Sequence, residues 1–492
     1  MNPVFFPAIG ALLVLALDVL ALPRAAAAHG PRSTALSGIR LGAVAMLSLA
    51  AVAASLRGGD PRFGDELLHL DSFGVFGVGF IVFAGLLVLS LSLTHFGMAR
   101  SRPAEPLALL LFAWAGSMIA VVTDHLLVLL VAIELAWLPM IALIAIDSRR
   151  LSSSESSLKA FFAHVFASLV FAHGVAFVFG ATGRLDLGAL AGSGVEGSLL
   201  FEVGLTLILV GLIARAAVAP FHPWSPDVHE GAPSFVTTHI ATVAQATTFF
   251  VLLRMLNVVP SPELVGNSEI GARIPQLLSV LGFVGLLWGF AMALVQVGLR
   301  RLVGWLGVGQ AGFFTLALVV ARGDGAEALI FGVIAAGVST AGIMATLSSL
   351  SHHERACENV GDLAGMMQRS PIRAALLALF FLSLAGLPGT FGFVARFKLL
   401  AALEHGGHRW ELVACLGATV LALTAVGRPL IEMLRQTEAG REGSRALSNE
   451  QFVLAICGVI VVYFGIVPVL GETPLAGQIT IWIERAVASL RI

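Results

Sequence analysis

Two ionisable side chains lie in strongly apolar stretches of this sequence. Glu134 lies in VLLVAIELAWLPMIAL, and Lys159 lies in SSLKAFFAHVFASL. An unpaired carboxylate in such a stretch is costly, so Glu134 is either a proton site or part of a structural ion pair. A Glu134–Lys159 pair across neighbouring helices would suit proton transfer, because each charge shifts the pKa of the other. Alternatively, Lys159 extends to a membrane interface.

Other cations occur farther along the chain. Arg215 and Arg396 are permanent cations that release a proton only with difficulty, so they are expected to hold a carboxylate or to set an electric field. Lys398 follows Arg396 by two positions, which places it on about the opposite helical face.

Histidines are the next candidates, because histidine titrates nearest to neutral pH. For His164, His173 and His222 a hydrogen-bonded structural role is the simpler interpretation. His239 is the exception, because it lies in an apolar stretch close to Arg215 in the sequence. Metal ligation is not expected: the pair His352-His353 lacks partners at ligand spacing, and the three cysteines are far apart.

The composition defines the elements that must position these residues. Of the 492 residues, 58% are hydrophobic and 12% are charged, against roughly 25% charged in soluble proteins. Continuous apolar stretches of about 20 residues recur, which indicates an all-α polytopic membrane protein and excludes a β-barrel. The net charge of −1 suggests no nucleic-acid partner. We count about fourteen transmembrane helices by the length criterion, at 3–22, 38–56, 72–95, 104–122, 125–146, 159–180, 198–219, 234–258, 276–298, 301–321, 326–350, 371–394, 409–434 and 451–471.

Arginine and lysine in the predicted loops favour an orientation with both termini outside. Residues 3–22 are expected to be retained as the first span, since no basic region or evident cleavage site accompanies them. Residues 473–492 could form an amphipathic helix along the membrane surface.

Two predicted spans are interrupted by proline. Span 7 has Pro220 near its end, and span 12 contains AGLPGTFG with Pro388. Proline breaks a helix, and the freed backbone groups must be buried in protein or line a wet cavity. Five spans separate the breaks, which is typical of inverted-repeat transporters. We therefore predict two inverted five-helix repeats, spans 4–8 and 9–13, with broken helices 7 and 12. The predicted domains are 1–103, 104–258, 276–434 and 435–492.

The sequence argues against a redox or nucleotide site in this chain. Gly307 to Gly312 spells G-x-G-x-x-G, but the motif lies inside an apolar span, where small residues allow close helix packing. The sequence has no cysteine cluster for an iron–sulfur centre and no P-loop. It is therefore not expected to oxidise NADH or hydrolyse ATP itself.

The hairpin VAPFHPWSPDVHEGAPSFVTT carries a resemblance to a known family. It closely resembles the signature of the antiporter-like membrane subunits of complex I, the proton-pumping NADH:quinone oxidoreductase, and is most similar to the subunit N (mitochondrial subunit 2) type. Glu134 and Lys159 match the family's span-5 glutamate and span-6 lysine. Further stretches also resemble the family: GATGRLDL (180–187), LRRL (299–302) with QAG (310–312), DLAGM (362–366) and LSLAGLP (382–388).

The resemblance implies a proton-translocating membrane-arm subunit of a bacterial inner-membrane complex. Such a subunit binds no cofactor; NADH and quinone are used elsewhere in the complex, and its partners are the other membrane-arm subunits and the bilayer. Glu134, Lys159, Arg215, His239, Arg396 and Lys398 are then the candidates for the proton pathway.

The sequence also departs from the family. The family usually has lysine where Arg215, Gln245 and Arg396 stand, and none of these three replacements titrates easily. His239 or a chain of water molecules could replace the central site. The alternatives are a subunit of a cation/proton antiporter, a subunit of another ion-coupled complex such as a hydrogenase or an inorganic-carbon pump, and a scaffold paralogue that does not pump.

Overall fold

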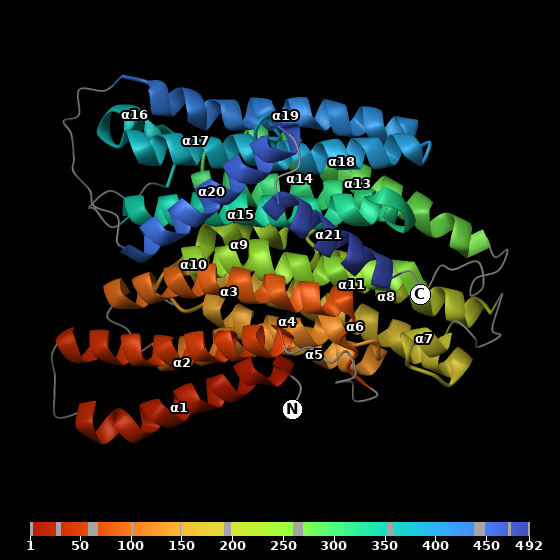
Figure 1. Ribbon diagram of the computed structural model, residues 1–492, viewed down its shortest axis with the longest axis horizontal. Coiled ribbons are helices and arrows are strands. Elements are labelled where there is room, and N and C mark those ends of the chain that lie inside the picture. The colour runs from red at the N-terminus through yellow and green to blue at the C-terminus, as the bar shows by residue number, and fades with distance from the viewer. Residues whose placement is uncertain are drawn as a thin grey trace.

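The computed structural model describes a bundle of helices that run roughly parallel or antiparallel to one another (Figure 1). The described residues are 3–25, 31–57, 67–99, 103–147, 149–190, 198–258, 269–351, 358–436, 448–470 and 474–490. The predicted all-α class is confirmed. The first half of the chain contains α1 (Phe6–Ala25), α2 (Pro31–Arg57), α3 (Ser72–Ala99), α4 (Ala104–Val122), α5 (Leu126–Ile144), α6 (Leu151–Thr182), α7 (Leu187–Leu190), α8 (Leu199–Arg215), α9 (Trp224–Gly231), α10 (Ser234–His239), the π-helical η2 (Ile240–Ala244) and α11 (Gln245–Val258).

The second half is built in the same way. It contains α13 (Glu269–Leu294), α14 (Leu299–Val319), the π-helical η3 (Ala321–Gly325), α15 (Ala326–Ser351), α16 (Met366–Arg369), α17 (Pro371–Ala385), α18 (Phe391–His405), α19 (Arg409–Leu434), α20 (Ser448–Leu470) and α21 (Pro474–Ser489). Within the described part of the chain, ten helices are long and apolar enough to cross a membrane, and shorter apolar helices accompany them. The protein is a multi-pass membrane protein.

Each of the predicted spans coincides with a helix or with a broken pair of helices. Among the boundaries that differ from the prediction, two concern candidate site residues. Helix α6 begins at Leu151, so Lys159 lies inside the helix instead of opening it. The second half of span 12 continues to His405, beyond the predicted end at residue 394.

Both predicted helix breaks are present. Helix α8 ends at Arg215, and Pro220 and Pro223 precede the short α9. Helix α17 ends at Gly386, whose φ of 77° is the left-handed conformation that favours glycine at a helix C-terminus. Pro388 then prevents the helix from continuing, and α18 restarts at Phe391.

Two small β-bridges show how the halves correspond. In the first half, the N–H of Leu126 donates to Leu185 (2.9 Å), and the N–H of Leu187 donates to Asp124 (2.9 Å). In the second half, the same pattern joins Leu299 to Glu358 (2.8 Å) and Val360 to Val297 (2.9 Å), and the same interval in residue number separates each residue from its counterpart. The chain crosses the membrane five times between His125 and Gly298. Because five is an odd number, the two bridges lie at opposite ends of the bundle, as an inverted repeat requires. The exact domain boundaries remain a prediction.

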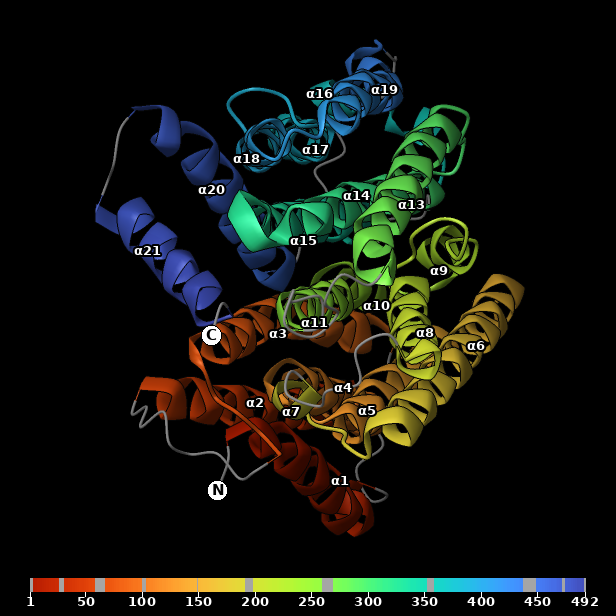
Figure 2. The same cartoon turned by 90° about the vertical axis from the view of Figure 1, so that its right-hand side faces the viewer.

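The end of the bundle that carries the first bridge is called the His125 end, and the opposite end is called the Gly298 end. Viewed end-on, α4 to α8 lie on one side, α13 to α19 lie on the other, and α10 and α11 lie between them (Figure 2). Helix α14 begins at the Gly298 end and finishes at the His125 end.

Glycines bring α13 and α14 into backbone contact. A Cβ atom on Gly312 would lie 2.3 Å from the backbone nitrogen of Leu286, and one on Gly289 would lie 2.3 Å from that of Gly309. A Cβ atom on Gly307 would meet nothing within 4 Å. The G-x-G-x-x-G sequence is therefore a packing motif, as predicted.

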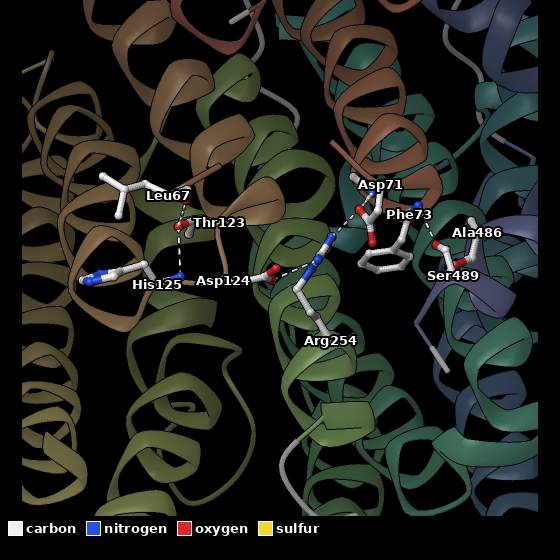
Figure 3. A network of polar contacts seen from close by, with 10 residues as sticks. Leu67, Asp71, Phe73, Thr123, Asp124, His125, Arg254, Ala486 and Ser489 are labelled. Carbon is white, nitrogen blue, oxygen red and sulfur yellow. Dashed lines mark hydrogen bonds and ion pairs between the residues drawn. The ribbon is translucent and has the colours of Figure 1, made fainter. Parts of the chain in front are cut away.

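A buried arginine ties four segments together at the His125 end (Figure 3). Arg254 on α11 donates to Asp71 (2.7 Å) and Asp124 (3.0 Å), and its guanidinium lies 5.5 Å from the centre of the Phe73 ring. The N–H of Phe73 donates to Ser489 (3.1 Å). The network joins α3, the α4–α5 connection, α11 and the C-terminal α21.

Replacing Arg254 with leucine should lower the free energy of unfolding by about 3 kcal/mol, because two carboxylates lose their shared cation. Arg184→Leu is the matched control, since Arg184 is an exposed arginine near the same end. Thermal unfolding of the purified protein in detergent measures both changes. Equal melting temperatures for the two variants would contradict a stabilising role for the network.

Candidate functional site

The first element of the candidate site is an ion pair between α5 and the end of α8. Arg215 Nη2 donates to Glu134 Oε1 (2.6 Å) and to the Ser168 hydroxyl on α6 (2.5 Å), and Ser168 also donates to Glu134. The Arg215 side chain is 1% exposed and that of Glu134 is 30% exposed. The carboxylate therefore has a partial opening at the protein surface, whereas its cation faces inward.

Arg215 also faces a small internal cavity. Its Nε and Nη1 atoms are buried and have no protein acceptor. The cavity, here called the Arg215 cavity, has a volume of about 30 Å³, and a water molecule needs about 10–15 Å³. The polar side chains in its lining include Arg215, Ser225, His229, Gln245, Gln310 and Thr340, and the indoles of Trp137 and Trp224 line it too. Water in this cavity would satisfy the free guanidinium donors, which are costly to leave unpaired.

The second element lies at the break between α17 and α18. Arg396 donates from Nη2 to the carbonyl of Leu384 (2.6 Å) and from Nη1 to that of Ala385. Gln310 on α14 donates to the same Leu384 carbonyl (2.6 Å). Arg396 lines a second cavity of about 20 Å³, here called the Arg396 cavity.

Gln310 and Ala336 line both small cavities, so the two cavities are neighbours. The Gln310 amide is the polar group that they share. It lies between the arginine of the first repeat and the arginine of the second.

Each end of the bundle has a larger vestibule. The vestibule at the Gly298 end has a volume of about 650 Å³, and its lining includes Glu230, Arg300 and Arg301. The vestibule at the His125 end has a volume of about 410 Å³, and its lining includes Asp324 and His405.

Helix α14 lines all four spaces in order along its length. Arg300 and Arg301 line the Gly298-end vestibule, and Val303, Gly307 and Gln310 line the Arg215 cavity. Gln310, Phe313 and Ala317 line the Arg396 cavity, and Leu318 to Val320 line the His125-end vestibule. The four spaces therefore form a series across the membrane, and α14 is their common wall.

The predicted Glu134–Lys159 pair is not the contact that the structure shows. Glu134 is paired with Arg215, whereas Lys159 binds Glu155 (2.6 Å) and Asp227 on α9 (2.7 Å). Lys159 and Ser168 lie nine residues apart on α6, about 14 Å along its axis. Of the two, Ser168 is the residue that contacts Glu134.

Lys398 and Arg396 point to different partners, as their spacing predicts. Lys398 binds Glu327 on α15 (2.6 Å) and is partly exposed, while Arg396 is buried at the helix break. Lys398 does not line either small cavity.

His239 is fully buried but does not line the Arg215 cavity, although its neighbours Ile240 and Ala241 do. Its Nδ1 accepts a hydrogen bond from the indole of Trp114 (3.2 Å). Because an indole N–H only donates, Nδ1 must be unprotonated and Nε2 carries the proton of this neutral histidine. His239 therefore has a different setting from the one expected next to Arg215.

Sequence reasoning missed Ser168 and gave Gln310 no role. Both are polar residues inside apolar spans, and Ser168 follows His164 by one helical turn, so the two lie on one face. That pattern was available in the sequence. The partner of each residue was not, because it depends on which helices are neighbours.

Comparisons with known proteins agree with this architecture. Residues 123–422 match the family described as "NADH:quinone oxidoreductase/Mrp antiporter, TM". NADH-quinone oxidoreductase subunit N 1 of Symbiobacterium thermophilum is 31% identical over a 483-residue alignment that covers 95% of each chain. Subunit N of Bdellovibrio bacteriovorus is 29% identical over 360 residues, covering 72% of this chain and 73% of the relative.

Solved structures show the same fold. A chain of respiratory complex I from Thermus thermophilus superposes with a TM-score of 0.77 at 26% identity, covering 95% of this chain and 98% of that one. A chain of the Mrp complex from Dietzia sp. has a TM-score of 0.83 at 20% identity, covering 100% and 97%, which shows the fold alone. The resemblance seen in the sequence is confirmed, and the chain belongs to the NADH:quinone oxidoreductase/Mrp antiporter transmembrane family, with relatives named NADH-quinone oxidoreductase subunit N.

Proposed function

We propose that this chain is a proton-translocating membrane-arm subunit of a complex I-like NADH:quinone oxidoreductase in a bacterial inner membrane. The observation that carries the proposal is the series of four spaces along α14, two vestibules and two small cavities. Polar groups at each space would hold water molecules, and protons would pass along them. Other subunits would hold the redox centres and use NADH and quinone, and this chain would bind neither.

Glu134 is the titratable group of the proposed pathway. When its carboxylate takes up a proton, Arg215 loses its counter-ion and becomes an uncompensated cation beside the Arg215 cavity. In a medium of low dielectric constant this charge repels a proton in the neighbouring water strongly. Proton uptake at Glu134 would thus drive a proton from the Arg215 cavity towards Arg396.

Of the three lysine positions of the family, Arg215 and Arg396 keep a positive charge and Gln245 does not. Arg215 supplies a permanent charge, and Gln245 and Gln310 supply hydrogen-bonding groups that orient water.

In the proposed orientation both termini lie outside, so the Gly298 end faces the cytoplasm and the His125 end faces outward. The pathway then has no direct contact with Lys159, His239 or Lys398, which influence it only through the groups that they bind.

Glu134→Gln tests the proposal in the assembled complex, reconstituted into vesicles. The amide still accepts a hydrogen bond from Arg215 but carries no charge to exchange, so proton transport per electron should fall while quinone reduction continues. Glu105→Gln is the control, because Glu105 is an exposed glutamate on α4. Unchanged transport in Glu134→Gln would instead support a scaffold that does not pump.

A further inference from the structure

Arg396 differs from the other buried arginines in its lack of a counter-ion. Counted over the whole residue, Arg215, Arg254 and Arg396 are 3%, 6% and 6% exposed. Arg215 binds Glu134, and Arg254 lies between Asp71 and Asp124 (Figure 3). Within the described residues, no carboxylate forms an ion pair with Arg396.

The neighbours of Arg396 do not neutralise it. Its hydrogen bonds go to the carbonyls of Leu384 and Ala385, and its guanidinium lies 4.5 Å from the centre of the Phe313 ring and 5.6 Å from that of Phe290. The carbonyls belong to the negative C-terminal end of α17. The positive N-terminal end of α18 lies at the same break, so the two helix dipoles largely cancel and the full charge of the guanidinium remains.

An uncompensated cation at this depth is unfavourable. Removing a charge from water costs several kcal/mol even after the protein relaxes. Charges within membrane spans almost always pair with an opposite charge or with backbone carbonyls, and Arg396 has two carbonyls but no opposite charge within the described residues. Arg396 is also enclosed by its own chain, so a carboxylate from a neighbouring subunit could not reach it without moving α14 or α18. A small mobile anion is the remaining way to restore neutrality.

The Arg396 cavity is small, and polar side chains line part of its wall. Its volume of about 20 Å³ accommodates one water-sized particle and excludes larger oxyanions. Gln310, Ser383 and Arg396 are polar groups in its lining. The N–H of Gly392, near the start of α18, donates to the Ser383 hydroxyl (3.2 Å). The aromatic and aliphatic remainder of the wall keeps the local dielectric constant low, which strengthens the attraction between an anion and the guanidinium.

We propose that the Arg396 cavity binds one small monovalent inorganic anion of halide size, such as chloride. The bound anion would take the place that Glu134 has beside Arg215. Its further role, which rests on the proposed function, is to regulate the proton route: the cavity holds one small particle, so a bound anion displaces the water molecule there and interrupts the route. Binding itself does not depend on transport.

Radioactive chloride measures this site directly by equilibrium dialysis. The complex containing this chain is purified in gluconate buffer, and chloride replaces gluconate at constant ionic strength. Wild type is expected to show a saturable site that Arg396→Gln weakens at least tenfold. Gln310→Glu should weaken it equally, because the new carboxylate would lie beside Arg396 and replace the anion.

Gln296→Glu is the control, because it adds the same charge at the connection between α13 and α14, outside both small cavities. Its chloride binding should equal that of wild type. Gln310→Glu keeps the test decisive if Arg396→Gln fails to assemble.

Two results would overturn the inference: no saturable chloride site in the wild type that depends on this chain, or full binding in Gln310→Glu. If chloride binding is absent while proton transport is normal, the anion site is wrong and the proposed function stands. If chloride binds but Glu134→Gln transports protons normally, the anion site stands and the proposed function is wrong.

Discussion

A valine in place of Gly312 is expected to prevent stable folding of the protein in the membrane. Its Cβ atom would lie 2.3 Å from the backbone nitrogen of Leu286 and 2.7 Å from its Cα atom. Such contacts cannot be relieved by rotating a side chain, so α13 and α14 would have to separate. Overpacking of a core costs roughly 1–3 kcal/mol when side chains can yield, and a larger loss is expected here. The amount of protein extracted from membranes and its melting temperature measure the effect.

Gly307→Ala provides the matched control in the same helix and the same motif. Nothing lies within 4 Å of the added Cβ atom, so folding should be unaffected. If Gly312→Val and Gly307→Ala accumulate to equal levels, close packing of α13 on α14 is not what the motif provides.

The sequence was sufficient to predict the architecture because the bilayer imposes simple rules. Apolar length located the spans, and proline with glycine located both helix breaks at Pro220 and Pro388. The boundary of α6 was wrong because its first turns are rich in serine and contain Glu155. They extend the helix beyond the apolar stretch, which hydropathy alone does not detect.

The partners of the candidate site residues could not be predicted from the sequence. Glu134 had Lys159 and Arg215 as possible cations, and the choice between them depends on helix depth and rotation. The structure places Arg215 and Ser168 at the level of Glu134 and places Lys159 beside Asp227. The nine residues between Lys159 and Ser168, about 14 Å along α6, decide which of them reaches Glu134.

The cavities were likewise beyond sequence reasoning. They arise where broken helices, a π-helical segment and small residues leave space between elements distant in the sequence. Gln310 gains its importance only because α14 passes both Arg215 and Arg396. The departures from the family's lysines were visible in the sequence, but their arrangement in neighbouring cavities was not.

Gln310→Leu should have the largest effect on transport of any change in the centre of the bundle. Leucine fills the same position but offers no hydrogen bond, and a hydrophobic constriction blocks conduction by excluding water. A water molecule that passes this point would lose its hydrogen bond to the Gln310 amide, and an unmet hydrogen bond at a buried site costs about 1–3 kcal/mol. That cost adds to the barrier for proton transfer, so transport through this chain should fall about tenfold or more. The fold should persist, because the Leu384 carbonyl keeps its bond from Arg396.

Protons transported per electron in vesicles containing the assembled complex test the central claim most directly. Quinone reduction is recorded in the same vesicles, and Gln296→Leu serves as the control outside the small cavities. The four-space pathway predicts that Gln310→Leu lowers the proton-to-electron ratio, while Gln296→Leu leaves it at the wild-type value. A wild-type ratio in Gln310→Leu, with the complex fully assembled, would contradict a proton route along α14.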